Sequence, residues 1–355
     1  MRLQRTLSLI AVAALAAWSV SAAGPASPSV LVIGWDGCER ARLHEMLARG
    51  ELPNLRALAA RGALVDITVT SGATETKAGW TQILTGYRPE VTGVFSNRVY
   101  APIPPGLSIF ERAEAAAGGT GVFTAMIAAK EGNVDADPPR TLPWAEWRER
   151  AHRQGCDAPP EECLARRGGQ AIVVAGRRLA RFPGKPYFHT QFGMDAFANG
   201  LGSGPAVAGL AVATLEAVAG ERFLLFVQFA RPDRDGHEFG ERSGQYEAGL
   251  REDDCLTGDL LAALERLGLA SSTLVYVVGD HGFNPAGLRH SHAPNTFCAS
   301  NDPRIRRGGD RADIAPTVLK RMGIELATLR PPLDGTPLDE PRQPPGAVPP
   351  TGQGR

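Results

Sequence analysis

The sequence lacks an excess of charge of either sign and contains little lysine. Its 355 residues hold 38 basic and 38 acidic side chains, and only four of the basic ones are lysines. A balanced charge gives no reason to expect nucleic acid or an anionic membrane surface as the main partner. After residue 23, no apolar run approaches the roughly 20 residues that a membrane-spanning helix needs.

The first 23 residues have the pattern of a signal peptide. Arg2 and Arg5 precede the apolar run LSLIAVAALAAW, and the small residues of SVSAAG follow it. We therefore expect export with cleavage and a periplasmic or secreted protein. A membrane anchor is the alternative, although the run is short for a span. Without Arg2 and Arg5, 36 basic residues face 38 acidic ones, a formal net charge of −2.

No CxxC spacing occurs among the five cysteines, which disfavours a metal site built from them. Export would permit a disulfide bond. Cys156 and Cys163 flank the turn-rich segment DAPPEE and are the preferred pair. The odd count leaves at least one thiol free.

Strand-like and helix-like segments alternate along most of the chain. Because the order strand, helix, strand, helix favours a mostly parallel sheet covered on both faces, we predict an α/β fold. The pattern weakens over about 130–204, which we interpret as an inserted cap or lid within a domain spanning 24–338. A long helix is expected over about 243–267, and a last helix in DIAPTVLKRMG, with Asp313 as its cap. The Pro-rich residues 339–355 are predicted to be disordered.

Three strand-like segments end in acidic residues. They are VLVIGWDG at Asp36, LLFVQFARPDRDGH at Asp233, and LVYVVGDHG at Asp280. Ligands of open α/β sheets bind at the carboxyl ends of the strands, so these three ends should meet in one crevice. Taken singly, each Asp could simply belong to a turn.

Histidines cluster in the same part of the sequence. His237 follows Asp233 by four residues, His281 follows Asp280 directly, and RHSHAP contains His290 and His292. A mixture of carboxylate and imidazole ligands suits divalent metals, Zn²⁺ above all, although single histidines in loops are often merely solvated. We expect a metal site.

The stretch GATETKAGWTQILTG offers a hydroxyl near a predicted helix start. A threonine hydroxyl is a poor nucleophile near neutral pH and needs a base, a lowered pKa or a metal ion. Thr76 lies where a loop turns into a helix, and a helix N-terminus favours anions such as phosphate. A metal ion could therefore activate Thr76 toward a bound phosphoryl group.

Together these motifs resemble the alkaline phosphatase superfamily, specifically its nucleotide pyrophosphatase/phosphodiesterase-like branch, whose fold is related to that of the sulfatases. The matching segments are VIGWDG, TETKAGWTQILTGYRPEVTGV, PDRDGHEFG, VVGDHGF and HAPNTF. The resemblance implies a three-layer α/β/α sandwich and two divalent metal ions. The imidazole ligands favour Zn²⁺ as these ions. The resemblance also implies in-line attack by Thr76 on phosphorus and a phosphothreonine intermediate.

The resemblance assigns the metal ligands residue by residue. One ion would be held by Asp36, Asp280, His281 and Thr76. The other would be held by Asp233, His237 and a late histidine, for which we choose His292, with His290 as the fallback.

The chain departs from the branch just after Thr76. Where the phosphodiesterases usually carry TFPN, with an asparagine that contacts a phosphoryl oxygen, this chain reads TKAG and places Gly79 there. Lys77 could supply the missing charge or face solvent, and Trp80 could stack on a leaving group or lie in the core. The preference between monoesters, diesters and other esters therefore stays open.

Several other classes of protein fit less well. A formylglycine sulfatase would need a C/S-x-P-x-R motif, which is absent, and a phosphoglycerate mutase would need a larger inserted domain. A phosphoryl or phosphoethanolamine transferase is a second enzymatic alternative, and a binding protein of the same fold is the non-enzymatic one. A dinucleotide-binding enzyme is disfavoured because GWDGCERARL lacks the glycine pattern. The expected partner is a small-molecule phosphate or sulfate ester; the sequence leaves the oligomeric state open.

Overall fold

A computed structural model describes residues 27–118 and 121–342. The predicted leader and residues 343–355 of the predicted tail lie outside this range. In the described part, no helix has the length and apolar character needed to cross a membrane.

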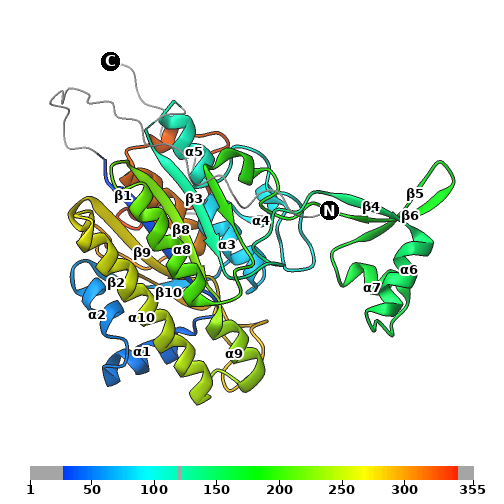
Figure 1. Cartoon of the computed structure of the whole chain (residues 1–355), viewed down its shortest axis with the longest axis horizontal. Helices are drawn as coiled ribbons and strands as arrows, with labels where there is room; N and C mark the ends of the chain where they lie inside the picture. The colour runs from blue at the N-terminus through cyan, green and yellow to red at the C-terminus, as the bar shows by residue number, and fades with distance from the viewer. Residues whose placement is uncertain (1–26, 119–120, 343–355) are drawn as a thin grey trace.

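A seven-stranded sheet forms the centre of the described structure (Figure 1). Its strands, in spatial order, are β2 (Ala63–Thr68), β10 (Asn295–Ser300), β9 (Thr273–Gly279), β1 (Ser29–Trp35), β8 (Phe223–Phe229), β3 (Phe123–Ala128) and β7 (Ala196–Ala198). The five strands from β9 to β7 run parallel, whereas β10 is antiparallel to both β9 and β2. The prediction of a mostly parallel sheet is confirmed.

Helices cover both faces of this sheet and give the predicted three-layer α/β/α sandwich. Every residue of β1 is buried, because alternate side chains of SVLVIGW enter two different cores. Leu31, Ile33 and Trp35 enter one core, and Val30 and Val32 enter the other. Each large apolar side chain buried in this way stabilises the fold by about 1.5–3 kcal/mol.

The first core is closed by helices from the N-terminal part and the middle of the chain (Figure 1). These helices are α1 (Arg40–Arg49), α2 (Pro53–Ala60), α8 (Gly204–Ala217) and α10 (Gly244–Arg266). The opposite core is closed by α3 (Thr76–Thr85), α4 (Pro89–Thr92), α5 (Ile109–Ala116) and α11 (Ile314–Arg321). The long helix expected over about 243–267 is therefore confirmed as α10.

Short helical turns complete the main domain. They are α9 (Arg231–Phe239), η1 (Thr190–Gly193), η2 (Ala270–Ser272), η3 (Arg311–Asp313) and η4 (Leu326–Thr328). Asp313 is the N-cap residue of α11, as the sequence predicted, but its side chain accepts no hydrogen bond from the first turn of that helix. Instead, the Asp313 carboxylate accepts hydrogen bonds from the Asp310 backbone N–H and the Arg307 guanidinium.

A small subdomain projects from the main body (Figure 1). It consists of β4 (Arg140–Pro143), α6 (Trp144–Arg153), α7 (Pro160–Ala165), β5 (Gln170–Val174) and β6 (Arg177–Phe182), with the strands in the order β4, β6, β5. Its own core is built around Trp147, Leu164 and Phe182. The predicted Cys156–Cys163 disulfide is confirmed and ties α7 to the segment after α6.

This subdomain is narrower than the segment 130–204 that the sequence suggested. The separate sheet occupies only 140–182, and β7 already belongs to the main sheet. The main domain also extends past its expected C-terminal boundary at residue 338. Asp339, the first residue of the predicted tail, pairs with Lys320 and Arg321 of α11.

Candidate metal-dependent active site

Charged side chains gather at the carboxyl ends of four neighbouring parallel strands. Asp36 follows β1, Asp280 follows β9, Asp233 lies on α9 directly after β8, and Lys130 follows β3. These strands are adjacent in the order β9, β1, β8, β3, so their ends open into one crevice. The convergence expected for the three aspartates is therefore what the fold produces.

Asp36 is completely buried and held by side chains on both flanks. Its Oδ2 accepts hydrogen bonds from Trp80 Nε1 at 3.1 Å and Gln228 Nε2 at 2.6 Å. Its Oδ1 accepts one from Lys130 Nζ at 2.7 Å. With both oxygens engaged, the carboxylate is fixed in orientation before any ligand binds.

The remaining two aspartates each keep one buried oxygen without a hydrogen-bond partner. Asp233 Oδ2 accepts from Lys130 Nζ at 2.6 Å and Asp280 Oδ1 from the Gly37 N–H at 3.1 Å. Asp233 Oδ1 and Asp280 Oδ2 have no hydrogen-bond partner among the described residues. Such unpaired buried oxygens are costly unless an ion or another ligand occupies them.

Three histidines turn their Nε2 atoms toward these oxygens, because their Nδ1 atoms are held by backbone carbonyls. His237 Nδ1 lies 2.9 Å from the Leu288 carbonyl, His281 Nδ1 lies 3.0 Å from the Gly282 carbonyl, and His290 Nδ1 contacts the Thr74 carbonyl. Since a carbonyl only accepts, each Nδ1 carries the proton and each Nε2 keeps its lone pair. Backbone-anchored imidazoles of this kind are typical of metal ligands.

The free Nε2 atoms and carboxylate oxygens fit divalent cations. The ligand atoms of Asp36, Asp280 and His281 lie within 4.8 Å of one another, as do those of Asp233, His281 and His290. His237 Nε2 lies 3.0 Å from His290 Nε2 and 3.5 Å from Asp233 Oδ1. Two bare imidazole nitrogens facing each other at that distance repel unless a cation lies nearby.

The choice of His292 as the late ligand is wrong. The residue is exposed, and its backbone N–H donates to Asn284 Oδ1 in the surface loop. His290, the fallback, is the one that stacks on His281 and lies 3.8 Å from Asp233 Oδ1. The sequence could not separate the two because they are two residues apart in the same loop.

The histidine assignment predicts a difference in metal content. His290→Ala removes an imidazole nitrogen that faces Asp233 and could bind a metal ion with it. We therefore expect at least a tenfold loss of metal affinity and less than the full metal content after gel filtration. His292→Ala is the matched control and should keep wild-type metal content. Elemental analysis of both purified variants would contradict the assignment if His292→Ala lost metal and His290→Ala did not.

The buried charges strongly influence one another. The pKa of Asp280 is raised well above its usual range, mainly by burial and secondly by repulsion from the neighbouring Asp36. Burial alone would raise the pKa of Asp233, but the Lys130 ammonium and His281 outweigh it and lower that pKa. Burial, followed by His281, lowers the pKa of His290 to about 4, and burial likewise lowers the pKa of His281. Neutral imidazoles facing carboxylates are suited to binding a cation.

Thr76 is the first residue of α3 and lies beside these clusters. Its hydroxyl is 3.1 Å from Lys130 Nζ and 3.5 Å from His281 Nε2, and the residue is only 1% exposed. The expected position of Thr76 at a helix start is confirmed. The hydroxyl therefore shares one small space with the ammonium and the ring nitrogen that touch Asp36 and Asp233.

Lys77 points away from this hydroxyl. Its Nζ donates to Asn133 Oδ1 at 2.7 Å, and its backbone N–H donates to Asn97 Oδ1 at 2.9 Å. Burial, followed by repulsion from Lys185, lowers the pKa of Lys77 to about 7. The positive charge beside the Thr76 hydroxyl is therefore that of Lys130 and not that of Lys77.

Neither Gly79 nor Trp80 is placed to contact a substrate. A Cβ on Gly79 would lie 2.6 Å from Asp280 Cβ. Glycine at this position therefore lets α3 approach the end of β9 closely, and no room is left for a side chain. Trp80 is fully buried, packs on Phe226, and orients Asp36. Stacking of Trp80 on a leaving group is wrong, and its core alternative is correct.

Two residues near Thr76 were missed at the sequence level. Lys130 was assigned to the inserted segment, although it follows the strand-like GVFTAMIAA just as Asp36 follows its own strand. Asn97 lies in GVFSN, whose resemblance to superfamily sequences was visible but carried no assigned role. Its backbone N–H donates to Glu75, and its Oδ1 accepts from Lys77, which leaves its NH₂ group free to donate.

Comparisons with known proteins identify the family of the chain. The profile of the Type I phosphodiesterase / nucleotide pyrophosphatase family matches residues 30–332. A 2,3-bisphosphoglycerate-independent phosphoglycerate mutase of Pseudomonas fluorescens (strain Pf0-1) is 32% identical over 122 residues, which cover 31% of this chain and 23% of the mutase. The match thus spans about a quarter of that relative's length.

Solved structures share the fold at low sequence identity. A 2-O GAG sulfatase superposes with a TM-score of 0.56 and 14% identity over 89% of this chain and 76% of that chain. A protein of the alkaline phosphatase superfamily from Vibrio parahaemolyticus gives a TM-score of 0.50 and 15% identity over 90% and 71%. With the family profile covering most of its length, the chain belongs to the Type I phosphodiesterase / nucleotide pyrophosphatase family of the alkaline phosphatase superfamily.

Proposed function

We propose that the protein is an exported hydrolase of phosphate esters that uses two divalent metal ions and Thr76 as nucleophile. The observation that carries this proposal is the convergence of the Thr76 hydroxyl, Lys130, and two groups of carboxylate and imidazole atoms, each with one unpaired carboxylate oxygen. Family membership supports the reaction class. Export rests on the leader-like pattern of residues 1–23.

The proposed metal ligands form two groups near Thr76, one for each ion. Asp36, Asp280, His281 and the Thr76 hydroxyl would hold one ion, and Asp233, His237 and His290 the other. Mixed carboxylate and imidazole ligands favour Zn²⁺ over Mg²⁺. When bound, the ions lower the pKa of the Thr76 hydroxyl and neutralise charge on the phosphoryl oxygens.

The chain supplies the nucleophile and its surroundings. Thr76 Oγ loses its proton to solvent and forms a bond to phosphorus while the ester P–O bond breaks, and the leaving oxygen takes a proton from solvent. Water then cleaves the Oγ–P bond, releasing phosphate and returning a proton to Thr76. The N-terminus of α3, where Thr76 is the first residue, favours the developing negative charge.

Lys130 and Asn97 are the chain's donors to the phosphoryl oxygens. Thr76 is almost fully buried, so an incoming phosphoryl group must replace the Lys130 contact with the hydroxyl. The ammonium would then transfer its hydrogen bond to a phosphoryl oxygen. A further cation near the reacting phosphate, beside the two metal ions, favours the dianion of a monoester over the monoanion of a diester.

The proposed substrate is a small-molecule ester, without nucleic acid as the main partner. The sheet and metal groups also suit sulfate esters, and a covalent intermediate could pass its phosphoryl group to another acceptor. Measured turnover of phosphate and sulfate esters distinguishes these enzymatic alternatives from a binding protein of the same fold, which would turn over neither.

Initial rates on three nitrophenyl esters test the proposal. With p-nitrophenyl phosphate, bis-p-nitrophenyl phosphate and p-nitrophenyl sulfate, we expect the monoester to be fastest. We expect a chelator to remove at least about 90% of the rate, with Zn²⁺ restoring it. Fastest turnover of the sulfate would favour a sulfatase, chelator-resistant turnover would contradict the metal role, and no turnover of metal-loaded protein would favour the binding protein. Restoration by Mg²⁺ but not by Zn²⁺ would contradict the choice of zinc.

A further inference from the structure

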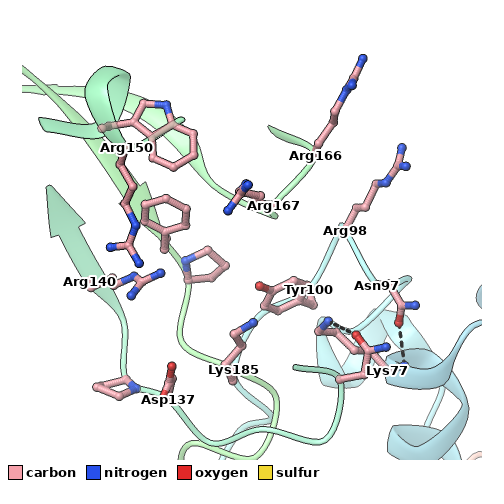
Figure 2. A pocket seen from close by; sticks show the side chains of 15 residues that line it. Lys77, Asn97, Arg98, Tyr100, Asp137, Arg140, Arg150, Arg166, Arg167 and Lys185 are labelled. Atoms are coloured by element: carbon pink, nitrogen blue, oxygen red, sulfur yellow. Dashed lines mark hydrogen bonds between the residues drawn. The ribbon is translucent and has the colours of Figure 1, made fainter. Parts of the chain in front are cut away.

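A cavity of about 410 Å³ lies between the projecting subdomain and the main domain. Lys77, Asn97 and Tyr100 contribute from the main domain, and residues of α6, β4 and β6 and of the segment directly after α7 contribute from the subdomain (Figure 2). This volume is within the range of small-molecule sites. None of the metal-site aspartates or histidines lines it, so it is distinct from the metal site.

The charge of the cavity wall is almost entirely positive. Besides Lys77, its cations are Arg98, Arg140, Arg150, Arg166, Arg167 and Lys185, and its one acidic residue is Asp137. In the described structure, Arg98, Arg140, Arg150 and Arg167 have no carboxylate within 4.0 Å. This excess of unpaired cations on a concave wall attracts anions, because the low-dielectric walls concentrate the field.

The aromatic side chains of the cavity are already occupied by these cations. The Arg140 guanidinium lies 4.9 Å from the Phe182 ring centroid and the Arg167 guanidinium 5.9 Å from that of Trp147. Lys77 Nζ lies 4.8 Å from the Tyr100 ring. Such contacts hold the cations in place. The cations so held line the cavity, which is therefore suited to anionic groups.

The cavity begins next to the nucleophile. Lys77 directly follows Thr76, and its Nζ reaches Asn133, which also lines the cavity. Figure 2 shows Lys77 and Asn97 at one side of the cavity and Arg140 and Arg150 across from them. The arginine-lined space therefore lies on the Lys77 side of Thr76.

We propose that this basic cavity binds a second anionic group on the leaving portion of the substrate, so that the preferred substrates are phosphate esters bearing a further phosphate or sulfate. The proposal rests on the proposed function for the reacting phosphate. The selectivity comes from the arginines, whose planar guanidinium groups bind phosphate and sulfate oxygens in pairs.

Symmetric bisphosphates provide a direct test of this selectivity. Butane-, hexane- and octanediol bisphosphates would be compared with the corresponding alkyl monophosphates, because either end of each bisphosphate presents the same reacting group. Alkanediol phosphate sulfates would compare sulfate with phosphate as the distal group. We expect kcat/KM for at least one bisphosphate length to exceed that of its monophosphate by about tenfold or more.

The test variant replaces two cavity arginines whose side chains make no ion pair in the described part of the chain. Arg98→Ala/Arg150→Ala should lower the ratio of bisphosphate to monophosphate kcat/KM by about tenfold, mainly through KM. The matched control is Arg148→Ala/Arg177→Ala, which removes the same charge from exposed positions outside the cavity. The control should leave the ratio within about twofold of the wild type.

The outcomes separate this proposal from the proposed function. A ratio near one at every length, or a ratio that the control lowers as much as the cavity variant does, would overturn the proposal even if monoesters are hydrolysed well. If no ester is turned over, calorimetric titration with hexanediol bisphosphate decides. Binding lost only in the cavity variant would support the cavity and contradict the phosphatase, and absence of binding would overturn both.

Discussion

Thr76→Ala is expected to reduce phosphate ester turnover by roughly a thousandfold or more while leaving the protein folded and metal-loaded. The substitution removes the only hydroxyl that lies within 3.5 Å of both Lys130 and His281 in the described structure. Without it, the covalent step has no nucleophile on the chain. Initial rates with p-nitrophenyl phosphate, circular dichroism and metal analysis would be measured on the same preparation.

Thr76→Ser is the matched control for this prediction. It keeps an oxygen at the first position of α3 and should retain activity far above that of Thr76→Ala. A Thr76→Ala enzyme within a few fold of the wild type would show that another group attacks phosphorus. Equal losses in both variants, with reduced metal content, would instead indicate that the methyl group matters for the shape of the site.

Lys130→Met is expected to lower kcat/KM for p-nitrophenyl phosphate by about 100-fold, and to lower that for bis-p-nitrophenyl phosphate by about tenfold or less. Methionine keeps the length of the side chain but loses its charge. The monoester dianion depends more on a cation at its oxygens than the diester monoanion does. The quantity to be measured is the ratio of the two losses.

Lys320→Met provides the control for loss of a lysine charge elsewhere. Lys320 pairs with Asp339 and Glu340 on the far part of the C-terminal segment and touches none of the site residues. It should leave both kcat/KM values unchanged within about twofold. Equal losses for the two esters in Lys130→Met would contradict a role at the phosphoryl oxygens. They would leave Lys130 only as the partner of Asp36 and Asp233.

The positions of Asp36, Asp233 and Asp280 could be predicted because each follows a strand in sequence. Parallel strands place their carboxyl ends together, so local sequence was enough to expect one crevice. The same rule applied to Lys130, which follows β3. It was missed because the weak pattern that starts there was attributed as a whole to the insert.

Other errors concern which way a side chain points, and this depends on contacts between distant segments. Trp80 is buried because its indole fills the space over Gly34 of β1, 46 residues earlier, and donates to Asp36. His290 faces Asp233 because its Nδ1 donates to Thr74, more than 200 residues away. Neither packing is visible in the local sequence, which is why the sequence favoured His292 over His290.

The projecting subdomain could be expected only in outline. Its Cys156–Cys163 pair was predictable from seven-residue spacing across a turn-rich loop. The arginines of its cavity come from separate segments, at 98, 140, 150 and 166–167, and only folding brings them together. No charge run in the sequence marks this cavity.

The most direct test of the account is to identify the phosphorylated residue during turnover. Wild-type protein hydrolysing p-nitrophenyl phosphate would be quenched in acid at a series of times, digested and analysed by mass spectrometry. The account predicts a phosphoryl group on the peptide containing Thr76, on Thr76 itself, and its absence from Thr76→Ala. Normal release of phosphate with Thr76 unmodified at every quench time, or a phosphoryl group on another residue, would contradict it.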